Sequence, residues 1–178
     1  MKTPGSLFLT GPMGSGKSTI GRQLAKQLGM GFHDSDHEIE RRTGVNIPLI
    51  FEIEGEQGFR KRERIVIDEL TQLPDIVLAT GGGAILDPDN RSHLGQRGRI
   101  IYLHTPVDVQ LARTASDRNR PLLQTENPRQ RLEELMQVRE PLYRETANLV
   151  VNTIGKRVRD VVREIVEQLN LNPHLSRD

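Results

Sequence analysis

The feature that most constrains this chain is a glycine-rich segment near its N-terminus, Gly11-Pro12-Met13-Gly14-Ser15-Gly16-Lys17-Ser18. It follows a short apolar run at 7–10, typical of a buried strand, and precedes a segment at 17–28 in which apolar residues recur every four positions, as in a helix. Its glycines let successive backbone N–H groups face a phosphate, and the positive end of the following helix favours the same anion. The segment matches the pattern GxxxxGK(S/T) in the context that phosphate binding requires, so it predicts nucleotide binding.

Six residues of this loop and of the helix start are candidates for nucleotide contacts, namely Gly14, Ser15, Gly16, Lys17, Ser18 and Thr19. Lys17 is expected to reach the β- and γ-phosphates, and the Ser18 hydroxyl is expected to hold Mg²⁺. The loop therefore predicts a bound nucleotide with Mg²⁺ but leaves the acceptor of a phosphoryl group open.

Short apolar runs recur along the rest of the chain at 32–34, 76–79, 100–103 and 149–151, each followed by turn residues or a helical pattern. Together with 7–10 they predict five strands alternating with helices, which implies an α/β fold with a parallel sheet covered on both faces. Ligands of such folds bind at the carboxyl ends of the strands. A single domain is expected over residues 1–178, because a chain of this length can bury one core and contains no linker.

Two apolar helical stripes are apparent. The last helix carries Val158, Val161, Val162, Ile165, Val166 and Leu169 at i, i+3, i+4 spacing, and an earlier helix carries Phe59, Val66, Leu70 and Leu73 on one face. Residues 171–178 follow the last stripe and are expected to form a flexible tail. Residues 113–127 lack apolar periodicity and are rich in Arg, Ser, Thr and Asn, which predicts a mobile polar segment.

The composition excludes several classes of function. Lys plus Arg number 25 and Asp plus Glu 24, for a formal charge of +1, and aromatic residues make up 3%, so no nucleic-acid partner is expected. The absence of cysteine excludes disulfides, thiolate metal sites and a cysteine nucleophile. No apolar stretch approaches the length of a signal-peptide core or a membrane span, so a cytoplasmic protein without membrane contact is expected. No apolar stripe is left without a partner, which favours a monomer.

Two carboxylates that could take part in metal binding or catalysis follow the second predicted strand. The runs that end at Thr80 and His104 carry no carboxylate, whereas Asp34-Ser35-Asp36 follows directly after Phe32-His33. If the extended geometry continues, both carboxylates point to the same side. One can act through the shell of Mg²⁺, and the other can accept a proton from a substrate hydroxyl. The alternative is that Asp36 only caps the next helix.

Three glycines, Gly81-Gly82-Gly83, follow the third predicted strand. They are expected at the same edge of the sheet as the phosphate loop, where their backbone can contact a ligand closely. The alternative is a flexible turn, and only the position of the glycines favours a ligand site.

Arg139 interrupts an apolar stripe. The stripe consists of Leu132, Leu135, Met136, Arg139, Leu142 and Tyr143. A buried guanidinium requires an anionic partner, which is either a carboxylate of the protein or a bound ligand. Pro141 is expected to disturb the helix beyond Glu140.

Arg113, Arg118 and Arg120 lie in or beside the polar segment. If the segment closes over ATP, an arginine there brings positive charge to the transferring phosphoryl group. The alternative is that all three are solvated charges of a surface loop. The pattern does not choose among them.

Taken together and in order, the segments GPMGSGKST, DSDHEIE, RTG, FRKRE, GGGA, RNRPLL and REPLYRE resemble the shikimate kinase family, from about Leu7 to the final helix. The phosphate loop alone is shared by a very large superfamily, whereas the combination of the other segments is specific to this family. The resemblance implies a three-layer P-loop fold with a five-stranded parallel sheet, a substrate-binding region at about 34–62 and a mobile lid at about 113–127. It implies ATP-dependent phosphorylation of the 3-hydroxyl of shikimate, a step of aromatic amino-acid biosynthesis.

The resemblance also implies the substrate contacts. Asp36 would bind the shikimate ring hydroxyls and assist deprotonation of the 3-hydroxyl. Arg60 and Arg139 would hold the shikimate carboxylate, and Gly82 would hydrogen-bond the substrate through its main chain.

On the nucleotide side, the resemblance implies that Asp34 lies near Mg²⁺, that Arg120 is the lid arginine at the γ-phosphate, and that Arg113 packs along the adenine. The chain departs from the family in two places. Where members often carry an Arg and a Pro against the adenine, this chain has Asn152-Thr153-Ile154-Gly155-Lys156, so that the contact falls to Lys156. A hydroxyl just before the glycines can come only from Thr80.

Two other functions remain as alternatives. A gluconate kinase-like enzyme would have the same phosphate loop, but Arg60 and Arg139 suit a carboxylate that is held at a fixed distance from the reacting hydroxyl. A non-catalytic ATP-binding module should lack Lys17, Asp36 or Arg120, and all three are present.

Overall fold

In the computed structural model of the protein, which describes residues 5–117 and 119–171, five strands form one sheet in the order β2-β3-β1-β4-β5. All of the pairings are parallel. The strands are β1 (Ser6–Thr10), β2 (Gly31–Asp34), β3 (Ile76–Ala79), β4 (Gly98–His104) and β5 (Leu149–Asn152). The predicted parallel α/β sheet is confirmed, and the strand ends differ from the predicted ends by at most two residues.

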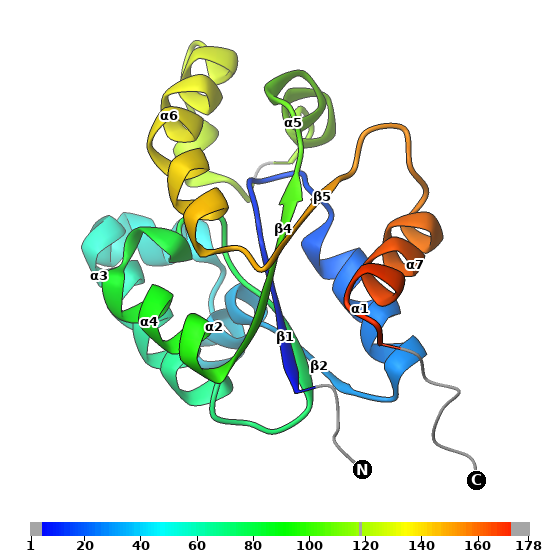
Figure 1. Ribbon diagram of the computed structural model, residues 1–178. Coiled ribbons are helices and arrows are strands. Elements are labelled where there is room, and N and C mark those ends of the chain that lie inside the picture. Colours follow the sequence, from blue (N-terminus) through cyan, green and yellow to red (C-terminus); the bar gives the residue numbers. More distant parts are fainter. Residues whose placement is uncertain (1–4, 118, 172–178) are drawn as a thin grey trace, which may run out of the picture.

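Helices cover both faces of this sheet (Figure 1). α1 (Lys17–Leu28) and α7 (Val158–Gln168) lie on one face, and α2 (Ser35–Thr43), α3 (Ile47–Leu70) and α4 (Pro88–Arg97) lie on the other. α5 (Val107–Thr114) and α6 (Pro128–Thr146) extend beyond the carboxyl end of β4. Two short 3-10 helices complete the fold: η1 (Ala84–Leu86) follows the glycine run, and η2 (Pro121–Leu123) lies within the polar segment 113–127.

The core is built around β1. Leu7 and Leu9 pack against α1 and α7, whereas Phe8 packs in a second cluster that contains residues of α2, α3 and α4. Because side chains alternate along a strand, consecutive apolar residues bury both faces of β1. β1 is therefore the central strand, and the phosphate loop leaves from the middle of the carboxyl edge of the sheet.

The apolar stripe of the last helix is confirmed, with Leu169 at the C-cap of α7. The predicted flexible tail is wrong at its first residue, because Leu171 is 5% exposed and packs into the same cluster as α1 and α7. The rest of that predicted tail, 172–178, lies outside the described residues.

A bend at Gly55 divides α3. Gly55 has φ 71°, a conformation that glycine adopts far more readily than other residues, so the chain changes direction between 47–54 and 56–70. The second part buries Phe59, Val66 and Leu70, as predicted. The prediction that Leu73 lies on this stripe is wrong, because α3 ends at Leu70 and Leu73 is 39% exposed.

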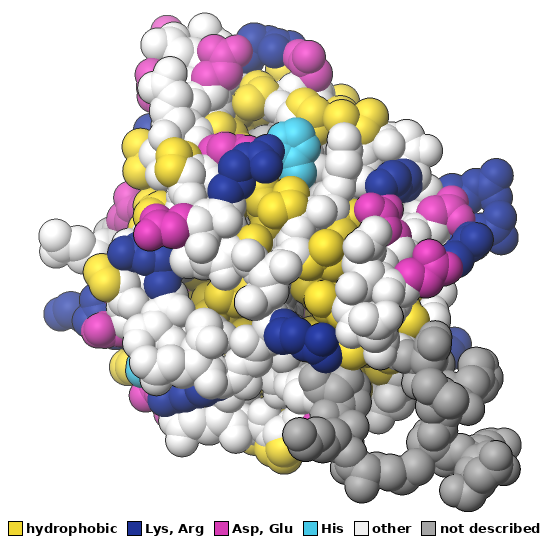
Figure 2. All heavy atoms as spheres, in the orientation of Figure 1, with side chains coloured by type: hydrophobic (Ala, Val, Ile, Leu, Met, Phe, Trp, Pro, Cys, Tyr) yellow, Lys and Arg dark blue, Asp and Glu magenta, His cyan; other side chains and the backbone are white. Residues whose placement is uncertain are grey.

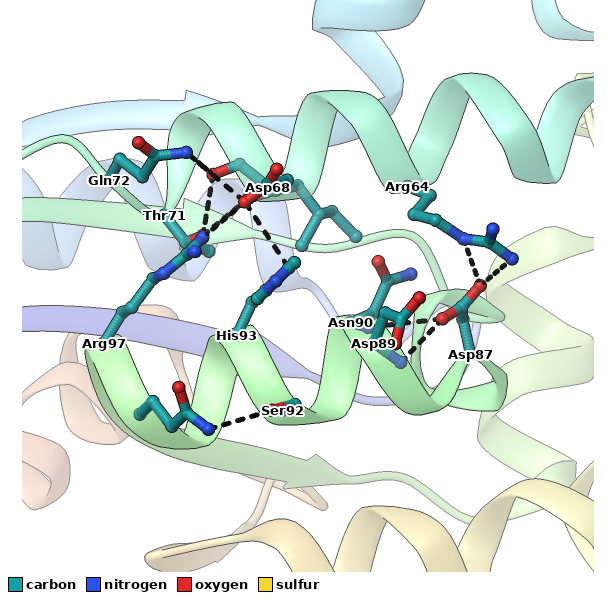
Figure 3. A network of polar contacts seen from close by, with 12 residues as sticks. Arg64, Asp68, Thr71, Gln72, Asp87, Asp89, Asn90, Ser92, His93 and Arg97 are labelled. Carbon is teal, nitrogen blue, oxygen red and sulfur yellow. Dashed lines mark hydrogen bonds and ion pairs between the residues drawn. The ribbon is translucent and has the colours of Figure 1, made fainter.

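Asp87 caps α4 and ties it to α3 (Figure 3). Its Oδ1 accepts hydrogen bonds from the N–H groups of Asp89 and Asn90, at 2.8 and 3.3 Å, and its Oδ2 accepts one from Arg64 of α3 at 2.7 Å. Figure 3 also shows a second network between the same two helices, centred on Asp68. These contacts join α4 to α3, and because Asp87 is also the C-cap residue of η1, they join the end of η1 to α3.

We expect Asp87→Ala to lower the free energy of unfolding by about 1–2 kcal/mol, because a lost N-cap costs about 1 kcal/mol and the solvent-exposed ion pair adds at most about 1 kcal/mol. Urea titration at neutral pH measures the effect. Asp89→Ala is the matched control, since it removes a carboxylate from the same helical turn. Equal stability of the two variants would contradict the capping role.

Candidate active site

The phosphate loop surrounds one end of a cavity of about 400 Å³. Gly16, at the N-cap of α1, has φ 85°, a left-handed conformation that suits glycine and lets the chain enter the helix. The first N–H groups of a helix have no intrahelical partner, so they remain available to an anion. The loop residues that line the cavity are Gly14, Gly16, Lys17, Ser18 and Thr19. Ser15, also predicted, is fully buried and supports the loop from inside.

Lys17 folds back on the loop. Its ammonium group donates hydrogen bonds to the carbonyl oxygens of Gly11 and Pro12, at 2.7 and 2.9 Å. Burial, together with the nearby charge of Arg120, lowers the pKa of Lys17 to about 7. An anionic phosphate in the cavity would favour the charged form of Lys17, so phosphate binding and protonation of Lys17 support each other.

Asp34, and not Asp36, is the cap of α2. Its Oδ1 accepts hydrogen bonds from the N–H groups of Asp36 and His37, at 3.0 and 3.1 Å. β2 ends at Asp34 and α2 begins at Ser35, so the expected extended geometry through Asp36 is wrong. The helix-cap alternative for Asp36 is contradicted as well.

The residues predicted to hold Mg²⁺ lie together. The Ser18 hydroxyl donates a hydrogen bond to Oδ2 of Asp34. These oxygen donors suit Mg²⁺, which proteins usually bind through one or two carboxylates together with phosphates of the substrate. Within the part of the chain that the structure describes, no group of three or more His, Cys, Asp or Glu side chains could hold a metal ion. The donor set thus fits Mg²⁺ bound jointly with a nucleotide.

Asp36 lies where the large cavity meets a second one. Its Oδ1 is buried and has no hydrogen-bond partner. Burial, and secondly the charge of Asp34, raises the pKa of Asp36 to about 6. A carboxylate with a raised pKa and a free oxygen can accept a proton from a ligand hydroxyl at neutral pH.

The second cavity measures about 60 Å³ and shares Asp36, Gly81, Gly82 and Arg120 with the first. Two aromatic residues and three charged residues also line the second cavity, namely Phe51, Phe59, Arg60, Glu63 and Arg139. The carboxyl edge of the sheet therefore carries a phosphate site and an adjoining site with two arginines.

Arg139 is 3% exposed, and its Nε and Nη2 atoms have no hydrogen-bond partner. No acidic side chain among the described residues lies within ion-pair distance of it. Burial lowers the pKa of Arg139, which reflects the cost of holding its charge away from water. Of the two partners considered above, the geometry therefore favours a bound anion over a carboxylate of the protein.

The predicted disturbance of α6 at Pro141 is wrong, because the helix continues through Pro141 to Thr146. Tyr143 packs in a cluster with Ile85 and with Tyr102 of β4. This packing stabilises the last turn even though Pro141 cannot donate a backbone hydrogen bond.

Arg60 shares the smaller cavity with Glu63, a residue that the sequence analysis missed. Their side chains form an ion pair of 2.9 Å, and Arg60 also pairs with Glu56 at 3.1 Å. Glu63 is 1% exposed, its Oε2 has no partner, and burial raises its pKa to about 7. It lies just beyond the predicted substrate-binding region, on the stripe of Phe59 and Val66.

The glycine run lies where side chains have no room. A Cβ atom at Gly83 would lie 2.3 Å from Nη2 of Arg60, and one at Gly81 would lie 2.7 Å from Oε2 of Glu63 and 2.8 Å from Oδ1 of Asp36. The close approach of these charged groups, rather than flexibility, explains the glycines.

Arg120 lines both cavities. Its Nε donates a hydrogen bond to Asp117 at 3.0 Å. After burial, its charge is the next cause of the lowered pKa of Lys17, and it partly opposes the rise in the pKa of Asp36. The structure thus brings Arg120 together with the phosphate loop and with Asp36.

The predicted mobile polar segment begins inside a helix, because Arg113 belongs to α5. Nη1 of Arg113 donates a hydrogen bond to the carbonyl of Gly14 at 2.8 Å, which places the side chain at the large cavity. Further along the segment, Leu123 packs in an apolar cluster with Met13. Arg118 lies outside the described residues.

Lys156 is not brought to the other site residues. Its ammonium group pairs with Glu164 of α7 at 2.5 Å, and it lines neither cavity. Its predicted adenine contact therefore has no support from this geometry.

Comparison with known proteins identifies relatives along nearly the whole chain. The model of the shikimate kinase family matches residues 13–170. A shikimate kinase from Halorhodospira halophila is 59% identical over 172 residues, which cover 97% of each chain. One from Methylococcus capsulatus is 60% identical over 166 residues, which cover 93% of each.

A solved structure gives the same result. A shikimate kinase from Acinetobacter baumannii in complex with shikimate matches with a TM-score of 0.93 and 55% identity, and the match covers 98% of this chain and 97% of that one. A gluconokinase from Sinorhizobium meliloti matches with a TM-score of 0.57 at 18% identity, covering 96% and 94%, which shows a common fold only. From these identities and their coverage, it follows that the chain belongs to the shikimate kinase family.

Proposed function

We propose the following reaction and residue roles. The protein is a shikimate kinase, which transfers the γ-phosphoryl group of ATP to the 3-hydroxyl of shikimate and yields ADP and shikimate 3-phosphate. The observation that carries the proposal is the buried Arg139 guanidinium, unpaired by any described carboxylate, in a cavity that joins the phosphate loop through Asp36. This arrangement suits an acceptor with both a carboxylate and a hydroxyl.

On the acceptor side, Arg60 and Arg139 hold the carboxylate of shikimate, and Gly82 contacts the ring through its main chain. Asp36 binds the ring hydroxyls and accepts the proton of the 3-hydroxyl as the oxygen attacks phosphorus. Holding the acceptor at both ends places the attacking oxygen beside the phosphate loop, so catalysis is largely positioning.

On the nucleotide side, Lys17 and Arg120 stabilise the charge of the transferring phosphoryl group. Ser18 and Asp34 would hold Mg²⁺, which when bound neutralises phosphate charge. Arg113 lies along the adenine, and Lys156 would reach it only after leaving Glu164. Residues 113–127 act as the lid that excludes water from the site.

The pH dependence follows from Asp36, whose pKa is about 6. Only the ionised carboxylate of Asp36 can accept the proton of the acceptor hydroxyl. At saturating ATP we therefore expect kcat/KM for shikimate to fall about tenfold per pH unit below about pH 6. Steady-state rates between pH 5 and 8 measure this. Glu63→Gln is the control, because the pKa of Glu63 is also raised and could produce a similar limb. Disappearance of the acidic limb in Glu63→Gln would contradict the assignment to Asp36.

We also propose that the protein acts as a monomer in the cytoplasm, without a nucleic-acid partner. On the face shown in Figure 2, basic and acidic side chains are interspersed, with no continuous basic area. The most exposed large apolar side chains are Ile53 and Ile65, which lie on either side of the bend in α3, and Val138 of α6. Among the described residues, no helix has the length and apolar character needed to cross a membrane.

Phosphorus NMR of the reaction mixture tests the proposed chemistry. With ATP, Mg²⁺ and shikimate, one new phosphomonoester signal should appear, and its coupling to the ring protons should place the phosphate on carbon 3. Phosphate on another hydroxyl would contradict the role of Asp36, and release of inorganic phosphate alone would contradict kinase activity.

A further inference from the structure

Two side chains of α6 meet Gly82. Nη1 of Arg139 would lie 3.4 Å from a Cβ atom placed on Gly82, and the hydroxyl of Tyr143, one helical turn further along, donates a hydrogen bond to the Gly82 carbonyl. We propose that Tyr143 is a positioning residue for the acceptor site: its hydroxyl fixes the main chain of Gly82, against which the Arg139 guanidinium lies. This role rests on the proposed function, because Arg139 and Gly82 are the groups assigned to shikimate.

The direction of this hydrogen bond is determined by its members. The Tyr143 hydroxyl has a single proton and donates it to the carbonyl oxygen of Gly82. One hydroxyl thus holds the main chain of Gly82 at its carbonyl.

This arrangement leaves the ligand-binding edge of the guanidinium free. Nε and Nη2 of Arg139 have no partner, whereas Nη1 faces the glycine run and would lie 3.4 Å from a Cβ atom placed on Gly82. A fixed glycine run limits where the guanidinium can lie on its Nη1 side, which favours the planar two-point contact that a carboxylate ligand requires.

The phenol itself is held firmly. Tyr143 is 1% exposed, and its ring stacks on that of Tyr102 with centroids 4.9 Å apart and planes at 22°. Tyr102 is fully buried in β4, and its hydroxyl donates to Glu140. Burial also raises the pKa of Tyr143 to about 12, so its hydroxyl keeps its proton at neutral pH. The position of the hydroxyl is therefore set by the core of the protein.

Tyr143→Phe tests the role, because it keeps the ring and its stacking and removes only the hydroxyl. We expect KM for shikimate to rise about threefold to tenfold, since a hydrogen bond between uncharged groups contributes about 0.5–1.5 kcal/mol. KM for ATP should stay within about twofold of the unmodified value, because Tyr143 lines neither cavity and its hydroxyl donates to Gly82. Titration calorimetry with shikimate should show the same loss of affinity.

Tyr102→Phe is the matched control. It removes a hydroxyl from the same stacked pair, but that hydroxyl contacts Glu140 and no site residue. Both variants should lose thermal stability, whereas only Tyr143→Phe should lose affinity for shikimate. Equal KM values for shikimate in the two variants, or a parallel rise of KM for shikimate and for ATP, would overturn the positioning role. If the unmodified chain showed no turnover with shikimate, the proposed function would itself be contradicted.

Discussion

Replacing Asp36 by asparagine is expected to lower shikimate-dependent turnover by about 10²–10⁴-fold, because the amide keeps the shape of the side chain but cannot accept the proton of the 3-hydroxyl. The free Oδ1 atom and the raised pKa of Asp36 are the structural basis of this expectation. Single-turnover rates with saturating ATP and shikimate separate the chemical step from binding.

The same variant should retain its fold and be at least as stable as the unmodified protein at pH 7. The pKa of Asp36 is raised from 3.8 to about 6, so its contribution to stability is present below about pH 4 and is lost as the pH rises through 6. The amide removes this penalty. Glu38→Gln is the matched control on α2, since Glu38 pairs with Arg41 and Arg42. Near-normal turnover of Asp36→Asn would contradict the role as base, and a lower melting temperature would show that the carboxylate mainly supports the fold.

Replacing Arg139 by alanine is expected to weaken shikimate binding by about 100-fold, because truncating one partner of a buried charge pair costs about 2–5 kcal/mol. ATP affinity should change by less than about twofold, since Arg139 lines the smaller cavity only. Titration calorimetry with each ligand separately gives both values.

Arg131→Ala is the matched control for Arg139→Ala, because Arg131 lies on the same helix and pairs with Glu134 near the surface. It should bind both ligands normally. An equal loss of affinity for shikimate and ATP in Arg139→Ala would contradict the carboxylate contact and would indicate general damage to the site.

Much of the fold could be predicted because apolar runs and stripes bury one side of each element. The five strands and α7 follow this rule directly. α4 could not be recognised in this way, since its sequence PDNRSHLGQR holds one large apolar residue, Leu94, and the helix depends on the Asp87 cap. The sequence does not predict the bend at Gly55 either, because a single glycine inside a helical pattern does not reveal its φ angle.

The same physical rule explains what was found and missed in the site. A charged residue on an apolar stripe identified Arg139. Glu63 interrupts the stripe of Phe59 and Val66 in the same way, so the same pattern could have predicted it as a site residue. The residue pattern alone could not separate the roles of Asp34 and Asp36, which only the family resemblance distinguished, because these roles depend on whether β2 stops at Asp34. Neither could the pairing of Lys156 with Glu164, which joins a loop to the following helix.

The most direct measurement is ADP release with ATP and Mg²⁺ held constant, comparing shikimate, gluconate, a nucleoside monophosphate and no acceptor. Release that depends on shikimate alone is the predicted result, because only this acceptor offers a ring carboxylate to Arg60 and Arg139 and a hydroxyl to Asp36. Release with gluconate or a nucleotide instead would contradict the assignment of the two arginines, and release that no acceptor stimulates would contradict kinase activity.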